Sequence, residues 1–468
     1  MNISKRLSKN VISNDVIGEA INDESALRMA KKPKKGKKEG SPHGRSRTTN
    51  LTDESGFEHD QTGSVANVHW RAIPMEDLRL HPNFKALPLT SDVELNSEHD
   101  YAQFRQDSIQ WDLLHAGRLT TSKAAACLGL YEPFSAKVLG VPRGLTSHSR
   151  AVGAWRQLQS DAMSLKDMQA YKESSRISVK GSHSRSTMSG LSRWTTGDSN
   201  PNNAFFAAEY TPKPEKRKKA WKHGRTDSNQ ARLAWGSAQE ATGILATVNY
   251  MHRLEMNFGQ RWSNGGSFAV QEVGLCPLEA IDLAATHPEA ALWCARGELP
   301  LIGASPDGLL VNSISGETQA LEVKCSSPFM HTSSRSHRLR VSDRLSRQGV
   351  GVWHIPQLQL EMLCAGPSCR AAVVVSLSAL KGATLYQVPR DDAYIYSMLV
   401  WLRRFHLTFT VLRHNGPPPQ NFFNSSTPGY IDLLEHTRRI AEGAKEIYKM
   451  HQSEVQRDDV NNNFFFYS

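Results

Sequence analysis

The chain has 468 residues, 39% of them hydrophobic, and a formal net charge of +10 with a sequence pI of about 9.2. Its 6 cysteines include no CxxC pair, which argues against a disulfide scaffold or a zinc ribbon, and no apolar run is long enough to cross a membrane. The basic balance favours a polyanionic partner, nucleic acid first, and the cysteines are expected to be reduced thiols of an intracellular protein.

Residues 1–85 are polar, charged and poor in aromatic residues, a composition typical of disorder. They contain the lysine run KKPKKGKK at 31–38. This run is compatible with a solvated linker, a nuclear import signal or a DNA-tethering arm. We predict a basic disordered N-terminal region and a nuclear location, with a mitochondrion or another organelle as the alternative.

Residues 86–156 are predicted to be the helical N-terminal part of a folded domain. RLTTSKAAACLGL at 118–130 indicates a helix that starts near Ser122, and the free N–H groups of a helix N-terminus can bind an anion. Residues 157–226 then lose periodicity, are rich in Ser, Arg and Gly, and carry a second basic run, KPEKRKKAWKHGR, at 213–225. We predict a disordered basic insertion there.

Helical and strand-like patterns alternate over 228–412, which predicts an α/β or α+β core with a mixed central sheet flanked by helices. The core is expected over 227–415, and 416–468 should form a C-terminal helix and tail. The predicted elements in chain order are a helix at 228–250, a strand at 267–275, a helix at 279–296, strands at 299–305 and 319–325, a helix at 355–366, strands at 371–378 and 383–389, and helices at 391–412 and 428–451.

Charged side chains interrupt the apolar strands near the middle of this core. SPDGLL places Asp307 in a Pro-x-Gly turn after the strand of 299–305, and a hairpin would return the strand that contains LEVKC beside it. In that second strand Glu322 and Lys324 project from one face. Two carboxylates can bind a hard cation such as Mg²⁺, and a lysine can orient the attacking water. The alternative is a turn aspartate plus an exposed Glu–Lys pair on an edge strand.

The order of GASPDGLL, ALEVKC and IPQLQLEMLCAG resembles the PD-(D/E)XK nuclease superfamily, and more closely its YqaJ viral recombinase and lambda-exonuclease branch. The resemblance covers about 228–412, with RLTTSKAAACLGL as an upstream element. It implies a restriction-endonuclease-like core and a metal-dependent DNA exonuclease, a hydrolase that degrades duplex DNA 5′ to 3′ from its ends in recombination or repair. It also implies Mg²⁺ or Mn²⁺, double-stranded DNA, a single-strand annealing protein as partner, and a homo-oligomer, a trimer by resemblance.

Carried over position by position, the resemblance assigns a metal site. Asp307 and Glu322 would be metal ligands, and the backbone carbonyl of Val323 would be another. Glu240, in WGSAQEATG, would complete the metal shell from its helix. The alternative for Glu240 is an ordinary solvent-facing helix glutamate.

The same resemblance assigns two further catalytic roles. Lys324 would act on the attacking water. Gln357, the first glutamine of PQLQ, would support the lysine or the water from the helix that follows. The alternative for Gln357 is an ordinary surface amide.

The family also binds a DNA 5′-phosphate through hydroxyl groups, and Ser122 in TTS and Ser305 in SPDG match those positions. The sequence departs from the pattern at His115, which stands where lambda exonuclease has a phosphate-binding arginine. Arg118, three residues later, could substitute for it. The departure leaves 5′-phosphate dependence and directionality open.

The sequence leaves two other functional classes open. A catalytically silent DNA-binding or assembly protein with the same fold would bind DNA in a salt-dependent way without turnover. The intact carboxylates and lysine argue against it. A structure-specific endonuclease would cut circular DNA, which offers no end to an exonuclease.

Overall fold

The computed structural model describes residues 72–180, 228–258, 268–331, 339–341, 347–379, 381–411 and 416–455. The predicted disorder of 1–71 and 181–226 falls outside these ranges, as do both basic runs. Within the described ranges, no helix combines the length and the apolar character that a membrane span requires.

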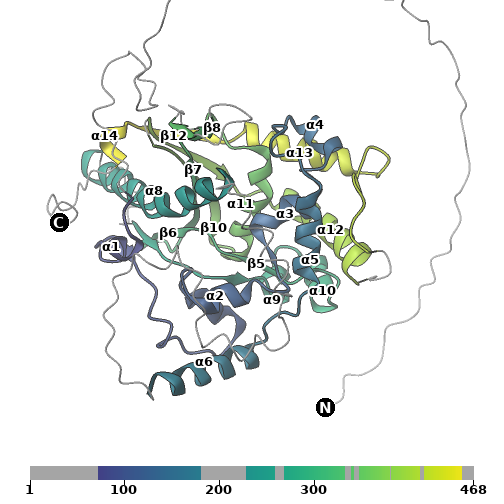
Figure 1. The fold of residues 1–468 in the computed structure, drawn as a ribbon, viewed down its shortest axis with the longest axis horizontal. Helices are drawn as coiled ribbons and strands as arrows, with labels where there is room; N and C mark the ends of the chain where they lie inside the picture. Colours follow the sequence, from purple (N-terminus) through teal and green to yellow (C-terminus); the bar gives the residue numbers. More distant parts are fainter. Residues whose placement is uncertain are drawn as a thin grey trace, which may run out of the picture. The chain divides into compact units, whose positions relative to one another are not determined.

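A seven-stranded mixed sheet in the order β1-β3-β6-β7-β10-β11-β12 forms the centre of the molecule (Figure 1). The pairs β1/β3 and β7/β10 are parallel, and the other neighbours are antiparallel. The predicted α/β class, with a mixed central sheet flanked by helices, is therefore confirmed. The strands are β1 (Phe84–Lys85), β3 (Phe268–Gln271), β6 (Gly308–Asn312), β7 (Thr318–Ser326), β10 (Cys369–Ser378), β11 (Gly382–Pro389) and β12 (Lys445–Met450).

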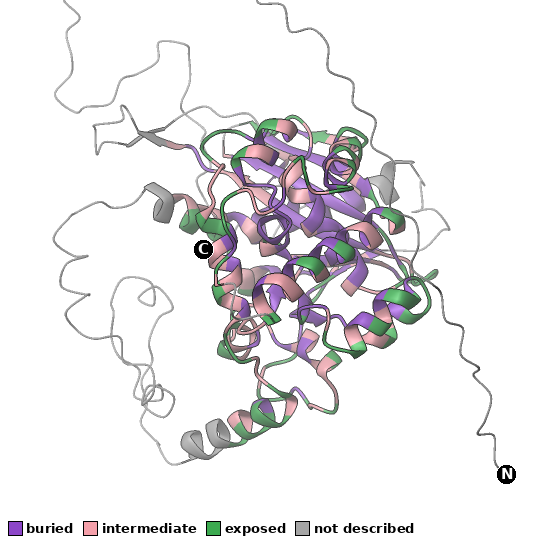
Figure 2. Cartoon of the chain, turned by 90° about the vertical axis from the view of Figure 1, so that its right-hand side faces the viewer, coloured by how far each residue is buried: buried purple, intermediate pink, exposed green. Residues whose placement is uncertain are grey.

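Helices cover both faces of this sheet, and the alternation of side chains along β7 separates the two interfaces. Leu321 and Val323 pack against α8 (Ser228–Phe258) in one hydrophobic cluster. Ala320 belongs to a second cluster with α11 (Ile355–Cys364), α3 (Thr121–Cys127), α12 (Asp392–Phe405) and α13 (Tyr430–Glu442). Glu322 and Lys324 therefore lie on the α11 side. Figure 2 shows the buried residues along the central strands and on the helix surfaces that face them.

A second sheet of three strands joins two sequence motifs that lie far apart in the chain. Its order is β2 (Leu119–Thr120), β5 (Ile302–Ala304) and β4 (Cys276–Pro277). β2 and β5 are parallel, with Thr120 opposite Gly303. Because the two strands run in the same direction, the TTS and SPDG segments leave the sheet at the same end.

The predicted hairpin of 299–305 with 319–325 is wrong in its first strand. β5 does not pair with β7; the antiparallel partner of β7 is β6, which begins after the turn with Gly308 opposite Leu321. Pro306 has no N–H to donate to a ladder, so the apolar run splits into two short strands in different sheets.

The predicted helix at 279–296 is two helices, α9 (Ala280–Ala284) and α10 (Pro288–Ala295). Pro288 cannot donate a helical hydrogen bond and instead opens α10 at its first position. The predicted helix at 391–412 is α12 followed by a π-helical turn, η4 (His406–Val411).

The last predicted helix, 428–451, is also wrong beyond residue 442. α13 ends there, and the next element is β12, which pairs with the free side of β11, with Met450 opposite Ala383. Helical spacing in the sequence could not reveal that β11 offers an edge for a strand.

Two predicted boundaries of disorder need correction as well. α1 (Met75–Leu78) and β1 precede residue 86, and Leu78 and Phe84 are buried in the cluster beneath α8. α6 (Leu165–Lys180) occupies the start of the predicted insertion and buries Met168. The remaining elements are η1 (Glu98–Gln103), α2 (Ile109–Leu114), α4 (Pro133–Leu139), α5 (Ser149–Leu158), β8 (Phe329–His331), β9 (Leu339–Val341), η3 (Val352–His354) and α14 (Gln452–Val455).

Candidate active site

The point where β6 ends positions Asp307 against β7. Beyond the pair Gly308–Leu321, β7 has no β6 partner, and the Val323 N–H donates instead to Asp307 Oδ2 at 2.6 Å. The N–H and C=O of one residue point to the same side of a strand, so the Val323 carbonyl faces this open edge as well. Gln106 Nε2 holds the turn by donating to the Pro306 carbonyl at 2.8 Å. The predicted strand-end aspartate is thus fixed beside β7.

Glu322, Lys324 and Gln357 form one hydrogen-bonded group between β7 and α11. Lys324 Nζ donates to Glu322 Oε1 and, at 3.3 Å, to Gln357 Oε1. Gln357 Nε2 donates to Glu322 Oε1 at 2.6 Å. Glu322 is only 4% exposed, and β7 lies between β6 and β10. The alternative of an exposed pair on an edge strand is therefore excluded, and the partly buried Gln357 amide is hydrogen-bonded to that pair.

Glu240 reaches the same region from α8, on the opposite side of the sheet. Gly243 lets this helix approach closely, because a Cβ at that position would lie 2.4 Å from Val323 Cγ1. Glu240 precedes Gly243 by three residues and so lies on the same helix face. It is partly buried, which excludes a fully solvent-facing role. Burial and the nearby charge of Glu322 raise the pKa of Glu240 to about 7.

Negative charge is in excess in this cluster. Burial, followed by the charges of Glu322 and Glu240, raises the pKa of Asp307 well above its ordinary value. Burial alone would lower the pKa of Lys324, but the charges of Glu322 and Asp307 outweigh it and raise that pKa. Three carboxylates thus gather around one ammonium group, and the repulsion among them would be relieved by a further cation.

The donor set suits a hard divalent cation, since it consists of carboxylate oxygens and a strand carbonyl. Within 72–180, 228–258 and the later described segments, however, no group of three or more His, Cys, Asp or Glu side chains stands in metal-binding geometry. Protein donors explain this: Glu322 Oε1 faces Lys324 and Gln357, and Asp307 Oδ2 faces the Val323 N–H. The predicted metal ligands therefore lie in one region, but Glu322 Oε1 and Asp307 Oδ2 accept hydrogen bonds from the protein.

Ser122 and Ser305 follow the parallel strands β2 and β5 at the same end of the small sheet, and His115 is linked to Ser305 through Trp111. Ser122 is exposed on the first turn of α3, with its hydroxyl 3.3 Å from that of Thr120. Ser305 Oγ accepts from Trp111 Nε1 at 3.0 Å. His115 Nδ1 lies 2.8 Å from the Trp111 carbonyl, and burial lowers the pKa of His115. Trp111 therefore links His115 to Ser305.

Arg118 does not join this group, and its predicted phosphate role is contradicted. The residue is 2% exposed, and its guanidinium lies 5.3 Å from the Tyr101 ring. Nη2 donates to Glu98 Oε2 at 3.1 Å, and Nη1 donates to the Leu114 and Met163 carbonyls. The side chain is turned inward and joins the N-terminal elements to one another.

Glu361 was not identified from the sequence, although it belongs to the same hydrogen-bond group. Its Oε1 accepts from Gln357 Nε2 at 2.8 Å and from Thr121 Oγ1 at 3.3 Å. Glu361 follows Gln357 by four residues in PQLQLE, a spacing that places both on one helix face. That spacing is the signal from which it could have been found.

A basic and aromatic region next to Lys324 was also not identified, because its residues come from separate segments. Arg347 Nη1 lies 2.8 Å from His354 Nε2, and the Arg150 guanidinium lies 4.4 Å from the Tyr131 ring. Burial, followed by the charges of Lys324 and Arg347, holds the pKa of His354 well below its ordinary value. Neither arginine forms an ion pair with any residue that the structure describes.

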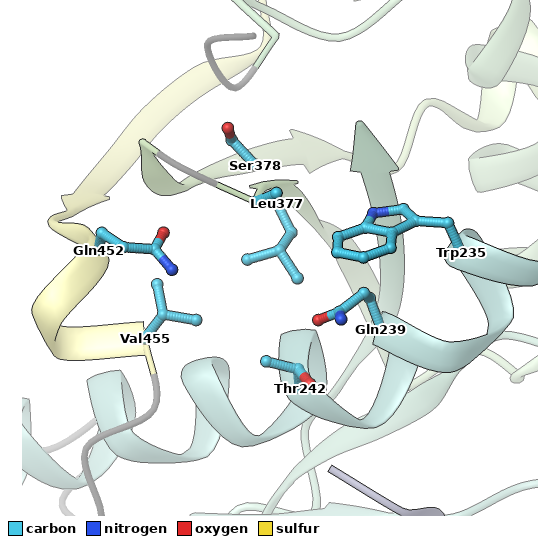
Figure 3. A pocket seen from close by; sticks show the side chains of 8 residues that line it. Trp235, Gln239, Thr242, Leu377, Ser378, Gln452 and Val455 are labelled. Atoms are coloured by element: carbon cyan, nitrogen blue, oxygen red, sulfur yellow. The ribbon is translucent and has the colours of Figure 1, made fainter. Parts of the chain in front are cut away.

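Two hollows of the described surface lie away from this cluster. The smaller, of about 10 Å³, is lined by Trp235, Gln239 and Thr242 of α8 together with residues of β10 and α14 (Figure 3). The larger is an open depression of about 560 Å³ that contains Arg390, Asp391 and Arg439. Neither is lined by any of the predicted site residues.

No family model matches the chain, and no curated protein matches it. Among solved structures, the chain is similar to an alkaline exonuclease, LHK-Exo, from Laribacter hongkongensis. The two share 14% sequence identity, the match covers 72% of this chain and 99% of that chain, and the TM-score is 0.25. Because this structural similarity is low, the function is inferred from the residues of this chain.

Proposed function

We propose that this chain is a metal-dependent deoxyribonuclease that hydrolyses duplex DNA from its ends in the 5′ to 3′ direction, as the resemblance to YqaJ and lambda-exonuclease proteins implies. The observation that carries the proposal is the convergence of Asp307, Glu322, Lys324 and Gln357 at the open edge of β7. An acidic group with one lysine is the arrangement that metal-assisted phosphodiester hydrolysis requires.

The cation in this proposal is Mg²⁺ or Mn²⁺, held by Asp307, Glu322, Glu240 and the Val323 carbonyl. Such a cation, when bound, lowers the pKa of a coordinated water and neutralises charge on the phosphate. The excess of carboxylates around a single lysine supports it, because burial and, after it, the charges of neighbouring carboxylates raise the pKa values of Asp307 and Glu240.

Lys324 acts in this proposal as a charged donor. Its raised pKa keeps the ammonium protonated at neutral pH, so it can orient the attacking water or stabilise charge on the phosphate. Gln357 holds Lys324 through its Oε1, and its amide group also holds Glu322. Gln357 and Glu322 together fix the position of the Lys324 ammonium before substrate binds.

The DNA is bound on two sides of this cluster. Ser122, Ser305 and His115 form the candidate site for the 5′-phosphate, and the exposed Ser122 hydroxyl is free to turn toward it. Arg347 and Arg150 supply positive charge for other backbone phosphates on the side of Lys324. The dependence on DNA ends follows from the first of these sites, because only a DNA end carries a terminal phosphate, and the 5′ to 3′ direction is what the resemblance implies.

The test is cleavage of linear duplex DNA by the full chain with Mg²⁺ or Mn²⁺, with 5′-phosphorylated and 5′-hydroxyl ends side by side. We expect digestion that stops with a chelator and in Asp307→Ala and Lys324→Ala. The matched controls are Asp432→Ala and Lys449→Ala, which alter exposed residues of α13 and β12. Absence of digestion, or digestion unchanged in the two site variants, would refute the proposal.

Closed circular DNA separates this function from its two alternatives. An exonuclease leaves the circle intact, whereas a structure-specific endonuclease nicks or linearises it. A silent DNA-binding protein retards both substrates and cuts neither.

The proposal also includes a nuclear location, an annealing protein as partner and a trimer. Imaging tests the location, co-purification tests the partner, and light scattering tests the oligomeric state.

A further inference from the structure

Glu361 is a buried carboxylate whose burial the fold itself does not explain. It is 0% exposed on α11, and its Oε2 has no hydrogen-bond partner within the described part of the chain. A half-satisfied buried carboxylate costs stability, and an apolar side chain of similar volume could fill the position with less penalty. Its presence at this position therefore points to a role other than packing.

Both hydrogen bonds that the Glu361 carboxylate accepts from described residues enter through Oε1, and one of them comes from the active-site amide. Gln357 Nε2 donates both to Glu361 Oε1 at 2.8 Å and to Glu322 Oε1 at 2.6 Å. An amide nitrogen carries two hydrogens, so both are used, and Gln357 Oε1 is left to accept from Lys324 Nζ. If the amide turned over, its oxygen would face two carboxylates and its nitrogen would face the ammonium.

The second hydrogen bond links this amide to another helix. Thr121 Oγ1 donates to Glu361 Oε1 at 3.3 Å, and Thr121 is 5% exposed on the first turn of α3. α3 and α11 lie side by side (Figure 1) and pack against each other on one face of the sheet. The next residue of α3 is Ser122, the exposed hydroxyl of the candidate phosphate site. Glu361 therefore joins the helix that carries Ser122 to the helix that carries Gln357.

We propose that Glu361 is a positioning residue, which holds the Gln357 amide in the orientation that presents its oxygen to Lys324 and ties that amide to α3 through Thr121. The inference rests on the proposed nuclease function and goes beyond it. Without Glu361, one N–H of Gln357 loses its acceptor, and the amide turns to find another. Lys324 then loses its hydrogen bond to Gln357 Oε1 and keeps the one to Glu322, although no group that touches DNA has been removed.

The experiment is steady-state cleavage of 5′-phosphorylated linear duplex DNA with Mg²⁺, below the unfolding temperature of every variant. The full-length variants are Glu361→Leu, Glu361→Gln, Gln357→Ala and the double variant Glu361→Leu/Gln357→Ala. We expect Glu361→Leu to lower kcat by about 10- to 100-fold, the usual effect of losing a group that orients a catalytic residue, with KM for DNA unchanged. Glu361→Gln should retain most of the activity, because its side-chain oxygen can still accept from Gln357.

The double variant tests whether Glu361 acts through Gln357. We expect Glu361→Leu to cause no further loss once Gln357 is Ala, since the amide that it positions is absent. The matched control is Gln359→Leu, which removes another fully buried polar side chain of α11 that binds the Pro389 carbonyl and the Asp391 N–H instead. It should lower the melting temperature and leave kcat unchanged.

Four results would overturn the inference: normal kcat in Glu361→Leu, an equal loss in the Gln357→Ala background, a loss in Glu361→Gln as large as in Glu361→Leu, or a kcat loss in Gln359→Leu that matches it. Each of these leaves the nuclease proposal standing. A wild-type chain without turnover would instead refute the proposed function, and the inference with it.

Discussion

The carboxylate cluster should make the metal-free protein less stable than a variant that lacks one carboxylate. Glu240 is the clearest case, because burial and the Glu322 charge raise its pKa from 4.5 to about 7. One pH unit corresponds to about 1.4 kcal/mol, so ionising Glu240 costs the folded state about 3 kcal/mol relative to the unfolded chain. Glu240→Gln keeps the shape, cannot ionise, and should recover most of this free energy at pH 8.

The sign of the pH dependence follows from the raised pKa. Between about pH 4.5 and about pH 7 the folded state holds a proton on Glu240 that the unfolded chain has lost, so stability falls as the pH rises through this window. Above about pH 7 both states are ionised and the contribution becomes constant. The stability difference between Glu240→Gln and wild type should therefore be small at pH 4.5 and full at pH 8.

The assay is denaturant unfolding with a chelator present, at pH 4.5, 6 and 8, for wild type, Glu240→Gln and the exposed control Glu435→Gln on α13. Adding Mg²⁺ at pH 8 should stabilise wild type more than Glu240→Gln, because the cation relieves repulsion that the variant no longer has. The reasoning fails if Glu240→Gln is no more stable than wild type at pH 8, if its advantage does not shrink on acidification, or if Glu435→Gln behaves in the same way.

Three further predictions concern packing, DNA contact and capping. Gly243→Ala should lower the free energy of unfolding by about 1–2 kcal/mol, because the clash of the new Cβ with Val323 Cγ1 outweighs the gain of about 1 kcal/mol in helix propensity. Adding Val323→Ala should make room for that Cβ, and a Gly243→Ala single variant more stable than wild type would contradict this prediction. Arg347→Ala should weaken DNA binding and reduce the slope of log affinity against log salt by about 1, whereas the exposed control Arg296→Ala should leave that slope unchanged. Asp391→Ala should lower the free energy of unfolding by about 1 kcal/mol, since Asp391 Oδ1 accepts from the Tyr394 N–H at the start of α12, and thermal unfolding measures the loss. Burial alone would raise the pKa of Asp391, but the hydrogen bonds it accepts lower that pKa, so this contribution should be present at neutral pH and disappear on acidification.

The sequence by itself determined the order of the chemical groups and most of the secondary structure. Alternation along LEVKC placed Glu322 and Lys324 on one face, and helical spacing in PQLQ placed Gln357 on the next helix. These patterns are local, so each can be recognised within a few residues of sequence. The approach of Asp307 to Glu322 and Lys324 was predicted because only a short connection separates SPDG from LEVKC, whereas the place of Gln357 beside them was implied by the family resemblance.

Tertiary structure alone decided which groups belong to the site. Arg118 and His115 look alike in the sequence as candidates for a phosphate contact, yet Arg118 is buried against Glu98 and Tyr101, and His115 remains beside Ser305 through Trp111. β12 forms because β11 offers an edge, not because 445–450 differs strongly from a helix. Side-chain burial and strand pairing depend on neighbours far away in the chain, so local spacing does not reveal them.

Glu361 combines both kinds of information. Its spacing from Gln357 is written in the sequence, but its meaning depends on Thr121, which is 240 positions away and comes close only when α3 packs on α11. Local periodicity sets which face of a helix a residue occupies. What that face touches is a property of the folded chain, because the free energy of burial depends on every group packed around it.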